Sequence, residues 1–72
     1  MPTKYLKKLG KNVRTIRLGR GWTQEKLAEK AGIHPVYISY IEQGTRNPSI
    51  TKILQVARAL ECHPTEIFEG LF

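Results

Sequence analysis

The apolar residues of this chain recur at three- and four-residue spacing in five short segments, and glycine or proline stands at most of the boundaries between them. Such spacing places apolar side chains on one face of a helix, whereas a strand requires strict alternation. No segment alternates in that way, and no repeat of about 20 to 50 residues is present. Because 72 residues suffice for one domain only, we expect residues 1–72 to form a single compact, all-α domain of five helices.

Start and stop signals place the boundaries of these helices. The first apolar face covers residues 5–16, and Gly19 and Gly21 bracket its end. The fourth helix is expected to begin at Ser49, and the fifth near His63 and Pro64, because proline suits a first helical turn. We expect the fourth helix to expose Thr51, Lys52, Gln55 and Arg58 and to bury Ile50, Ile53, Leu54, Val56, Ala57 and Leu60, and the fifth to carry Ile67, Phe68, Leu71 and Phe72.

The middle of the chain, about residues 23–43, has the pattern of a helix-turn-helix. Thr23 suits an N-cap because its hydroxyl can accept a hydrogen bond from a first-turn amide, and Gly32 ends the helix that follows. Pro35 favours the first position of the next helix and pushes His34 into the extended geometry of an N-cap. Gly44 is the expected left-handed stop. Two helices joined by such a short turn can present the second one to the major groove of DNA.

The outward face of this second helix carries no charged side chain. If Ile38 and Ile41 point inward, the outward residues are Val36, Ser39, Tyr40 and Gln43, with Pro35 and Tyr37 on the flanks. A solvated helix would be expected to carry Lys and Glu there, whereas a surface that touches base edges between phosphates can be neutral. The alternative is that Val36 and Tyr40 cover neighbouring parts of the core.

The net charge of +6 favours a polyanion or an anionic membrane as the partner, and it is unevenly placed. Residues 1–20 hold seven basic side chains and no acidic one. The basic face of the first helix can be read as a solvated surface or as a source of long-range attraction to DNA. A membrane-bound helix would explain neither the turn at Gly32 nor the neutral face, and no apolar run approaches the roughly 18 residues of a membrane span.

The residues that catalysis or metal binding would need are scarce. The chain has no Asp, two His and one Cys. Cys62 and His63 are adjacent, so their side chains diverge and form neither a nucleophile–base pair nor a zinc site. Cys62 has no partner for an internal disulfide, which fits a reducing cytoplasm, and it is expected to act as a small apolar side chain. We therefore expect no enzyme, no metal and no cofactor.

The sequence resembles the Cro and phage-repressor family of helix-turn-helix regulators, also called the Xre family, over nearly the whole chain, from about Leu6 to Phe68. The resemblance is carried by three stretches: Thr23-Gln24-Glu25-Lys26-Leu27-Ala28-Glu29-Lys30-Ala31-Gly32-Ile33, Tyr37-Ile38-Ser39-Tyr40-Ile41-Glu42-Gln43-Gly44 and Arg46-Asn47-Pro48-Ser49. It implies a lambda-repressor-like five-helix domain that binds a palindromic operator as a homodimer and regulates transcription. Related domains also serve as antitoxins or protein-interaction modules, which is the alternative function.

The resemblance also assigns roles to individual positions. Base-reading positions fall on Pro35, Val36, Ser39 and Tyr40. Contacts to the DNA backbone or its flanks fall on Thr23, Gln24, His34, Tyr37, Gln43, Thr45, Arg46 and Asn47. Many relatives have Gln, Arg or Ser at the first reading positions, so Pro35 and Val36 favour apolar contact with a thymine methyl group and leave polar readout to Ser39 and Tyr40.

Two further sets of residues follow from the same resemblance. Arg17 and Glu42 match an internal ion pair that joins the first helix to the end of the recognition helix, with a structural role. The last helix often supplies the subunit contact in this family, which makes Ile67, Phe68, Leu71 and Phe72 a candidate dimer interface, although the same residues could simply close the core.

Overall fold

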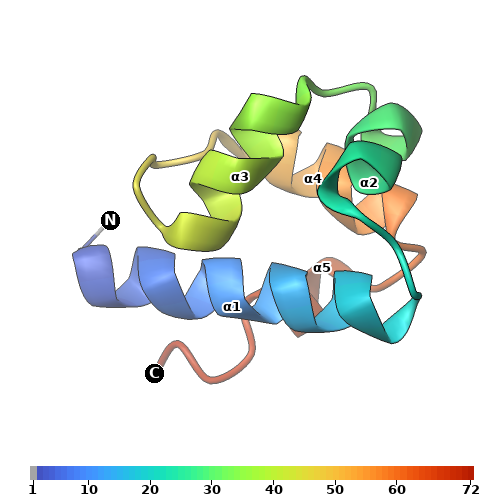
Figure 1. The fold of residues 1–72 in the computed structure, drawn as a ribbon. Coiled ribbons are helices and arrows are strands. Elements are labelled where there is room, and N and C mark those ends of the chain that lie inside the picture. The colour runs from blue at the N-terminus through green and yellow to red at the C-terminus, as the bar shows by residue number, and fades with distance from the viewer. Residues whose placement is uncertain (1) are drawn as a thin grey trace.

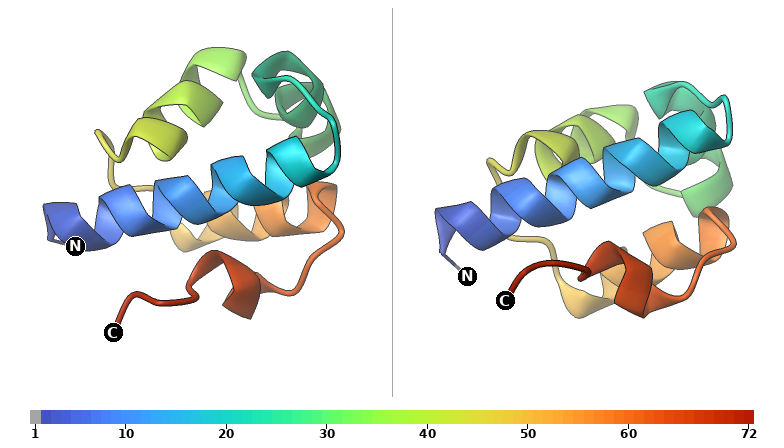
Figure 2. Two further views of the ribbon diagram at one scale, coloured as in Figure 1. Left: turned by 60° about the horizontal axis from the view of Figure 1, so that its bottom comes forward. Right: turned by 90° about the horizontal axis from the view of Figure 1, so that it is seen from below.

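The computed structural model describes residues 2–72 and contains five α-helices and no strand in that range. Their bounds are α1 Thr3–Gly19, α2 Gln24–Ala31, α3 Pro35–Gln43, α4 Ile50–Ala59 and α5 Pro64–Ile67. Figure 1 shows α3 packed on α1, with α2 beside α3 and α4 behind them. Figure 2 shows α5 on another side of α1 and the C-terminal segment running back toward the beginning of α1. The expected all-α, five-helix fold is confirmed.

The ends of the central helices are set by the residues that the sequence indicates. The Thr23 hydroxyl accepts from the amide of Lys26 at 3.1 Å, which caps α2. The His34 imidazole Nδ1 accepts from the amide of Val36 at 3.1 Å, which caps α3. Gly32 and Gly44, both at φ 70°, end the two helices in the left-handed conformation that glycine adopts at low cost. These local interactions fix both the length of α3 and the turn that precedes it.

The core lies where α1, α2, α3 and α4 meet, and Ile67 of α5 closes it. Its fully buried side chains are Leu9, Val13, Leu27, Ile38, Ile41, Val56, Leu60 and Ile67. Gly10 allows α1 and α3 to approach closely, because a Cβ atom there would collide with the backbone carbonyls of Ile41 and Glu42. Nothing in the spacing of residues along α1 distinguishes Gly10. Its need for glycine arises from α3, which is distant in the sequence.

The prediction for α4 was wrong at its apolar edge. Ile50 and Leu54 were expected to be buried, but they are 68% and 50% exposed. Helical geometry places Leu54 about 100° around the axis from the buried Ile53, outside the arc that the neighbouring helices cover. On the polar side, Lys52 and Gln55 are half-buried rather than exposed, and the Gln55 side chain donates to the Ala31 carbonyl at 3.3 Å.

The last helix is shorter than the sequence suggested. It ends at Ile67, so Leu71 and Phe72 lie beyond it rather than on its face. The Asn12 side chain donates to the carbonyls of Ile67 and Glu69, both at 2.8 Å, and this contact with α1 holds the chain where the helix stops. Satisfying two backbone carbonyls from α1 replaces the helical continuation that the spacing of apolar residues had indicated.

Candidate nucleic-acid interface

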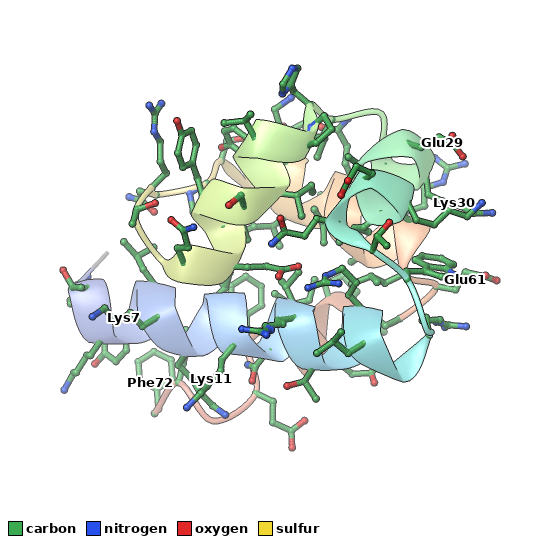
Figure 3. All side chains as sticks on the ribbon, in the orientation of Figure 1. Lys7, Lys11, Glu29, Lys30, Glu61 and Phe72 are labelled. Atoms are coloured by element: carbon green, nitrogen blue, oxygen red, sulfur yellow. The ribbon has the colours of Figure 1, made fainter. Side chains whose placement is uncertain are left out.

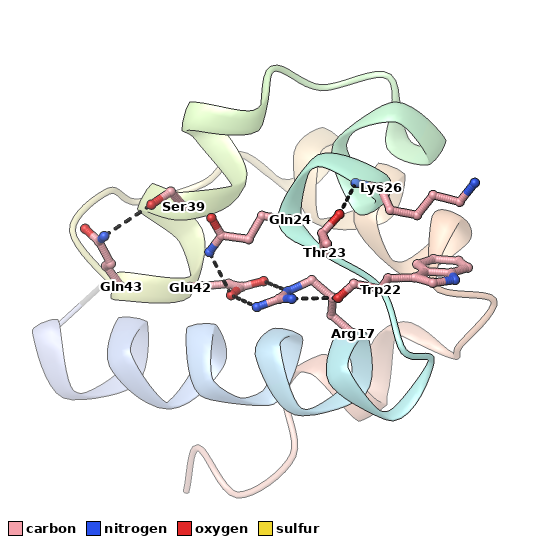
Figure 4. A network of polar contacts seen from close by, with 8 residues as sticks. All are labelled: Arg17, Trp22, Thr23, Gln24, Lys26, Ser39, Glu42 and Gln43. Carbon is pink, nitrogen blue, oxygen red and sulfur yellow. Dashed lines mark hydrogen bonds and ion pairs between the residues drawn. The ribbon is translucent and has the colours of Figure 1, made fainter.

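The side of α3 that faces away from the core is open to solvent and uncharged. Pro35 and Gln43 are exposed, Val36 is 47% exposed, and Ser39 and Tyr40 are half-buried. The Gln43 side chain donates to the Ser39 hydroxyl at 3.1 Å, so the two polar groups are held together one turn apart (Figure 4). Such groups can donate or accept, which is what contact with base edges requires.

Basic side chains from outside α3 lie against its tyrosines. The Arg46 guanidinium carbon stands 4.5 Å from the centre of the Tyr40 ring, and the Lys52 ammonium stands 5.7 Å from the centre of the Tyr37 ring. Cations over aromatic faces are held by the ring quadrupole. Arg46, in the loop after α3, and Lys52, on α4, therefore place positive charge next to the neutral face.

The other predicted flanking residues lie around the two ends of α3. Thr45, Arg46 and Asn47 are exposed in the loop after it, where the Thr45 hydroxyl donates to the Tyr40 carbonyl at 3.4 Å. His34 is exposed at the other end, where its Nδ1 atom is occupied by the cap. Thr23, at the beginning of α2, is likewise occupied by its cap. The structure thus brings the predicted reading and flanking positions to α3, the loop after it and the first turn of α2.

A buried ion pair fixes α3 against α1. Arg17 donates from Nε and Nη2 to the Glu42 carboxylate at 2.7 and 2.9 Å, and from Nη1 to the Trp22 carbonyl at 2.7 Å (Figure 4). Arg17 is only 7% exposed. The hydrogen bond to Glu42 raises the pKa of Arg17, more than burial lowers it. Arg17 therefore stays charged, and its Nε, Nη1 and Nη2 atoms each donate a hydrogen bond, the condition under which a buried charge is tolerated.

Gln24 joins this network, a contact that the sequence did not indicate. Its amide donates to Glu42 Oε1 at 3.1 Å (Figure 4). The role expected for Gln24 was a contact with a DNA phosphate. Because one side of its amide is bound to Glu42, the orientation of this residue is coupled to the orientation of α3.

The candidate dimer residues divide into buried and accessible ones. Ile67 is fully buried, so it belongs to the core and not to a subunit contact, which corrects the prediction for this residue. Phe68 and Leu71 pack partly against the core, and Phe72 is exposed with its ring centre 5.5 Å from that of Tyr5. The exposed pair Ile50 and Leu54, which had been expected inside, adds apolar surface.

Residues 2–72 contain no group of three or more His, Cys, Asp or Glu side chains arranged to hold a metal ion. Within the same range, no helix is both long and apolar enough to span a bilayer. Cys62 is half-buried against the core, and burial raises the pKa of its thiol.

The fold and the capped, solvent-facing α3 define a helix-turn-helix domain. A family model described as helix-turn-helix matches residues 13–67, and the chain belongs to this family. The sequence is 43% identical over 61 residues to control protein C.BamHI of Bacillus amyloliquefaciens, covering 83% of this chain and 75% of that protein.

Two solved structures are similar to the whole fold. The restriction-modification controller protein C.AhdI from Aeromonas hydrophila matches with a TM-score of 0.86 and 40% identity, covering 88% of this chain and 96% of that one. The controller protein C.Esp1396I, solved as a tetramer in complex with its natural 35-base-pair operator, matches with a TM-score of 0.83 and 37% identity, covering 93% and 88%. The assigned family and fold class are therefore confirmed.

Proposed function

We propose that this protein binds double-stranded DNA at a specific palindromic operator and regulates transcription, as a small controller-type regulator without catalytic activity. The observation that carries the proposal is the exposed, uncharged outer face of α3, which the Arg17–Glu42 pair holds against α1. The similarity to controller proteins, one of them bound to its operator, supports it. Pro35, Val36, Ser39 and Tyr40 would read bases, and the residues around the ends of α3 would contact the backbone.

The chemistry of these positions makes the proposed readout mixed. Val36 and Pro35 offer only apolar contact, which suits the methyl group of thymine. Ser39 and Tyr40 offer hydroxyl groups that donate or accept. Arg46 lies over the Tyr40 ring, so a phosphate contact by Arg46 and a base contact by Tyr40 would support one another.

The experiment begins with selection of bound sequences from a library of random duplexes and footprinting of the DNA upstream of the gene. Affinity is then compared for the selected duplex and an unrelated one. We expect Tyr40→Ala to lower the preference for the selected duplex about fivefold or more, since one good base contact contributes about 1 to 3 kcal/mol of discrimination. Binding to unrelated DNA should change much less, because it depends on phosphate contacts, of which only the one proposed for Arg46 involves the Tyr40 ring.

Tyr40→Phe is the matched variant. It keeps the ring under Arg46 and removes only the hydroxyl group, so it separates polar readout from packing of the loop. If wild-type protein bound all duplexes equally weakly at physiological salt, operator recognition would be rejected and the alternative of an antitoxin or protein-interaction module would be favoured.

We propose that the binding unit is a homodimer, with recognition helices about 34 Å apart on successive major grooves. A relative crystallised as a tetramer on its operator supports assembly. Phe68, Leu71 and Phe72 form one candidate contact, and Ile50 with Leu54 forms another. The mass in solution is measured for a chain truncated after Glu69 and for Leu54→Glu. We expect at least one of them to become monomeric, and if both stayed dimeric, Leu54, Leu71 and Phe72 would be excluded as residues that the dimer requires.

A further inference from the structure

Three basic side chains of α1 gather beside the C-terminal end of α3. Lys7, Lys11 and Arg14 are spaced four and three residues apart, so they share one side of the helix. Together with Lys8, Glu42 and Gln43 they line an open hollow of about 510 Å³ between the two helices. Figure 3 shows Lys7 and Lys11 projecting from α1 below α3. The three cations are exposed and, within residues 2–72, none of them is in an ion pair.

The position of these cations relative to α3 is fixed by backbone packing. A Cβ atom on Gly44 would stand 2.8 Å from the Cα atom of Lys7, so the end of α3 rests directly on the backbone of α1. Gly10 gives a second close approach, to the carbonyls of Ile41 and Glu42. Basic groups on α1 therefore keep a set distance from the proposed reading face.

We propose that Lys7, Lys11 and Arg14 bind consecutive phosphates of one DNA strand at the edge of the major groove that α3 enters. This inference rests on the proposed function and adds α1 to the interface. The seven residues from Lys7 to Arg14 rise about 10 Å along the helix, at about 1.5 Å per residue. One strand of B-DNA carries a phosphate about every 3.4 Å of axis and also winds around that axis, so neighbouring phosphates lie further apart than this rise. A row of about 10 Å therefore matches about two to three phosphates once the reach of the long side chains is included.

Two different roles for the same residues lead to different expected results. The cations could contribute only to the general positive field, in which case their position on the surface would not matter. Alternatively, Lys7 could serve the end of α3, which has no basic residue in its own last turn, by interacting with the negative end of the helix dipole. In that case its removal would lower stability without a specific effect on DNA binding.

The test compares two triple variants that lower the net charge equally, from +6 to +3. The first replaces Lys7, Lys11 and Arg14 by Gln. The control replaces Arg20, Lys30 and Arg58 by Gln, of which Lys30 lies at the other end of the molecule from Lys7 in Figure 3. Affinity for the selected operator duplex, about 30 base pairs or three helical turns long, is measured between roughly 50 and 200 mM salt.

We expect the first triple to reduce the slope of log affinity against log salt by up to about 2.7, since each phosphate contact contributes about 0.9. The control triple should leave the slope close to that of the wild type. The ratio of operator to unrelated-duplex affinity should stay nearly constant in the first triple, because phosphate contacts carry no direct sequence information. Tyr40→Ala should change that ratio instead, so the two proposals are measured separately.

Equal loss of slope in both triples would overturn the inference in favour of the general field. If the first triple kept the wild-type slope but had a lowered melting temperature, the inference would also be overturned, and the result would favour a role for Lys7 at the negative end of the α3 helix dipole. The double variant Lys11→Gln/Arg14→Gln keeps Lys7 at the end of α3, so it still reports on DNA binding if the triple folds poorly. Should wild-type protein show no operator preference at all, the proposed function would fail rather than the role of α1 alone.

Discussion

Replacing Glu42 by alanine removes one half of the buried ion pair and leaves Arg17 behind. The carboxylate receives three hydrogen bonds, two from Arg17 at 2.7 and 2.9 Å and one from Gln24 at 3.1 Å. After the change, Arg17 keeps only its bond to the Trp22 carbonyl. Breaking a buried pair in this way costs about 3 to 5 kcal/mol, because the remaining charge stays in a poorly solvated place.

That cost is large for a chain of this size. Domains have a free energy of unfolding of about 0.05 to 0.15 kcal/mol per residue, which gives roughly 4 to 11 kcal/mol here. In a domain of this length, 1 kcal/mol shifts the melting temperature by about 4 to 8 °C. We therefore expect Glu42→Ala to lower the melting temperature, followed by far-UV circular dichroism, by at least about 12 °C.

Glu29→Ala is the matched control, because Glu29 also takes part in an ion pair but on the surface. Its carboxylate is 3.7 Å from the Lys26 ammonium and well exposed. Surface pairs contribute about 0 to 1 kcal/mol, so this variant should melt close to the wild type. If Glu42→Ala had the same melting temperature as Glu29→Ala, the idea that Arg17 is a buried charge that needs Glu42 as its partner would be refuted.

A double variant, Arg17→Met/Glu42→Leu, tests the physical cause of the loss. If an unpaired buried charge is responsible, removing both charges should restore part of the stability lost in Glu42→Ala. If the double variant instead loses more unfolding free energy than Arg17→Met and Glu42→Leu lose together, an unpaired buried charge is not the cause of the loss. Recovery will be incomplete, since the Trp22 carbonyl and the Gln24 amide lose partners as well.

The remaining predictions concern α1 and the cysteine. Gly10→Ala should destabilise the fold by about 1 to 3 kcal/mol or more, because the new Cβ atom would collide with the Ile41 carbonyl. Gly19→Ala should be neutral or stabilising by less than about 1 kcal/mol, because a Cβ atom at Gly19 has nothing within 4 Å. Urea denaturation measures the free energy of unfolding of both variants. Cys62 should react more slowly with a thiol reagent in the native protein than in urea at the same pH, because burial raises the thiol pKa and so lowers the thiolate fraction, and equal rates would contradict this.

The parts of the fold that depend on local chemistry could be predicted from the sequence. Thr23 and His34 cap their helices through bonds to amides two or three residues away, and Gly32 needs only its own left-handed backbone conformation. Each of these helix boundaries depends only on residues within one turn of the helix. The turn and the outward face of α3 follow from these boundaries, which is why the recognition helix is where the sequence indicated.

The parts that depend on distant segments could not be predicted. Gly10 looks like an ordinary helical position until the carbonyls of α3 are placed against it. Leu54 fits the apolar spacing of α4, and only the arrangement of the neighbouring helices shows that its side of α4 is left uncovered. Gln24 could be assigned to the edge of α2 but not to the Glu42 carboxylate, which lies 18 residues further along the chain.

The proposed reading face of α3 is uncharged, whereas a row of cations lies on α1. A neutral face contributes little long-range attraction, so proposed selectivity by Val36, Ser39 and Tyr40 depends on α3 being placed correctly relative to the cations of α1. Arg17 belongs to α1 and Glu42 to α3, and their pair is the polar bond between the two surfaces. A folded variant that lacks the pair should therefore lose operator preference even though every proposed DNA contact is still present, because bases and phosphates could no longer be met in one fixed geometry.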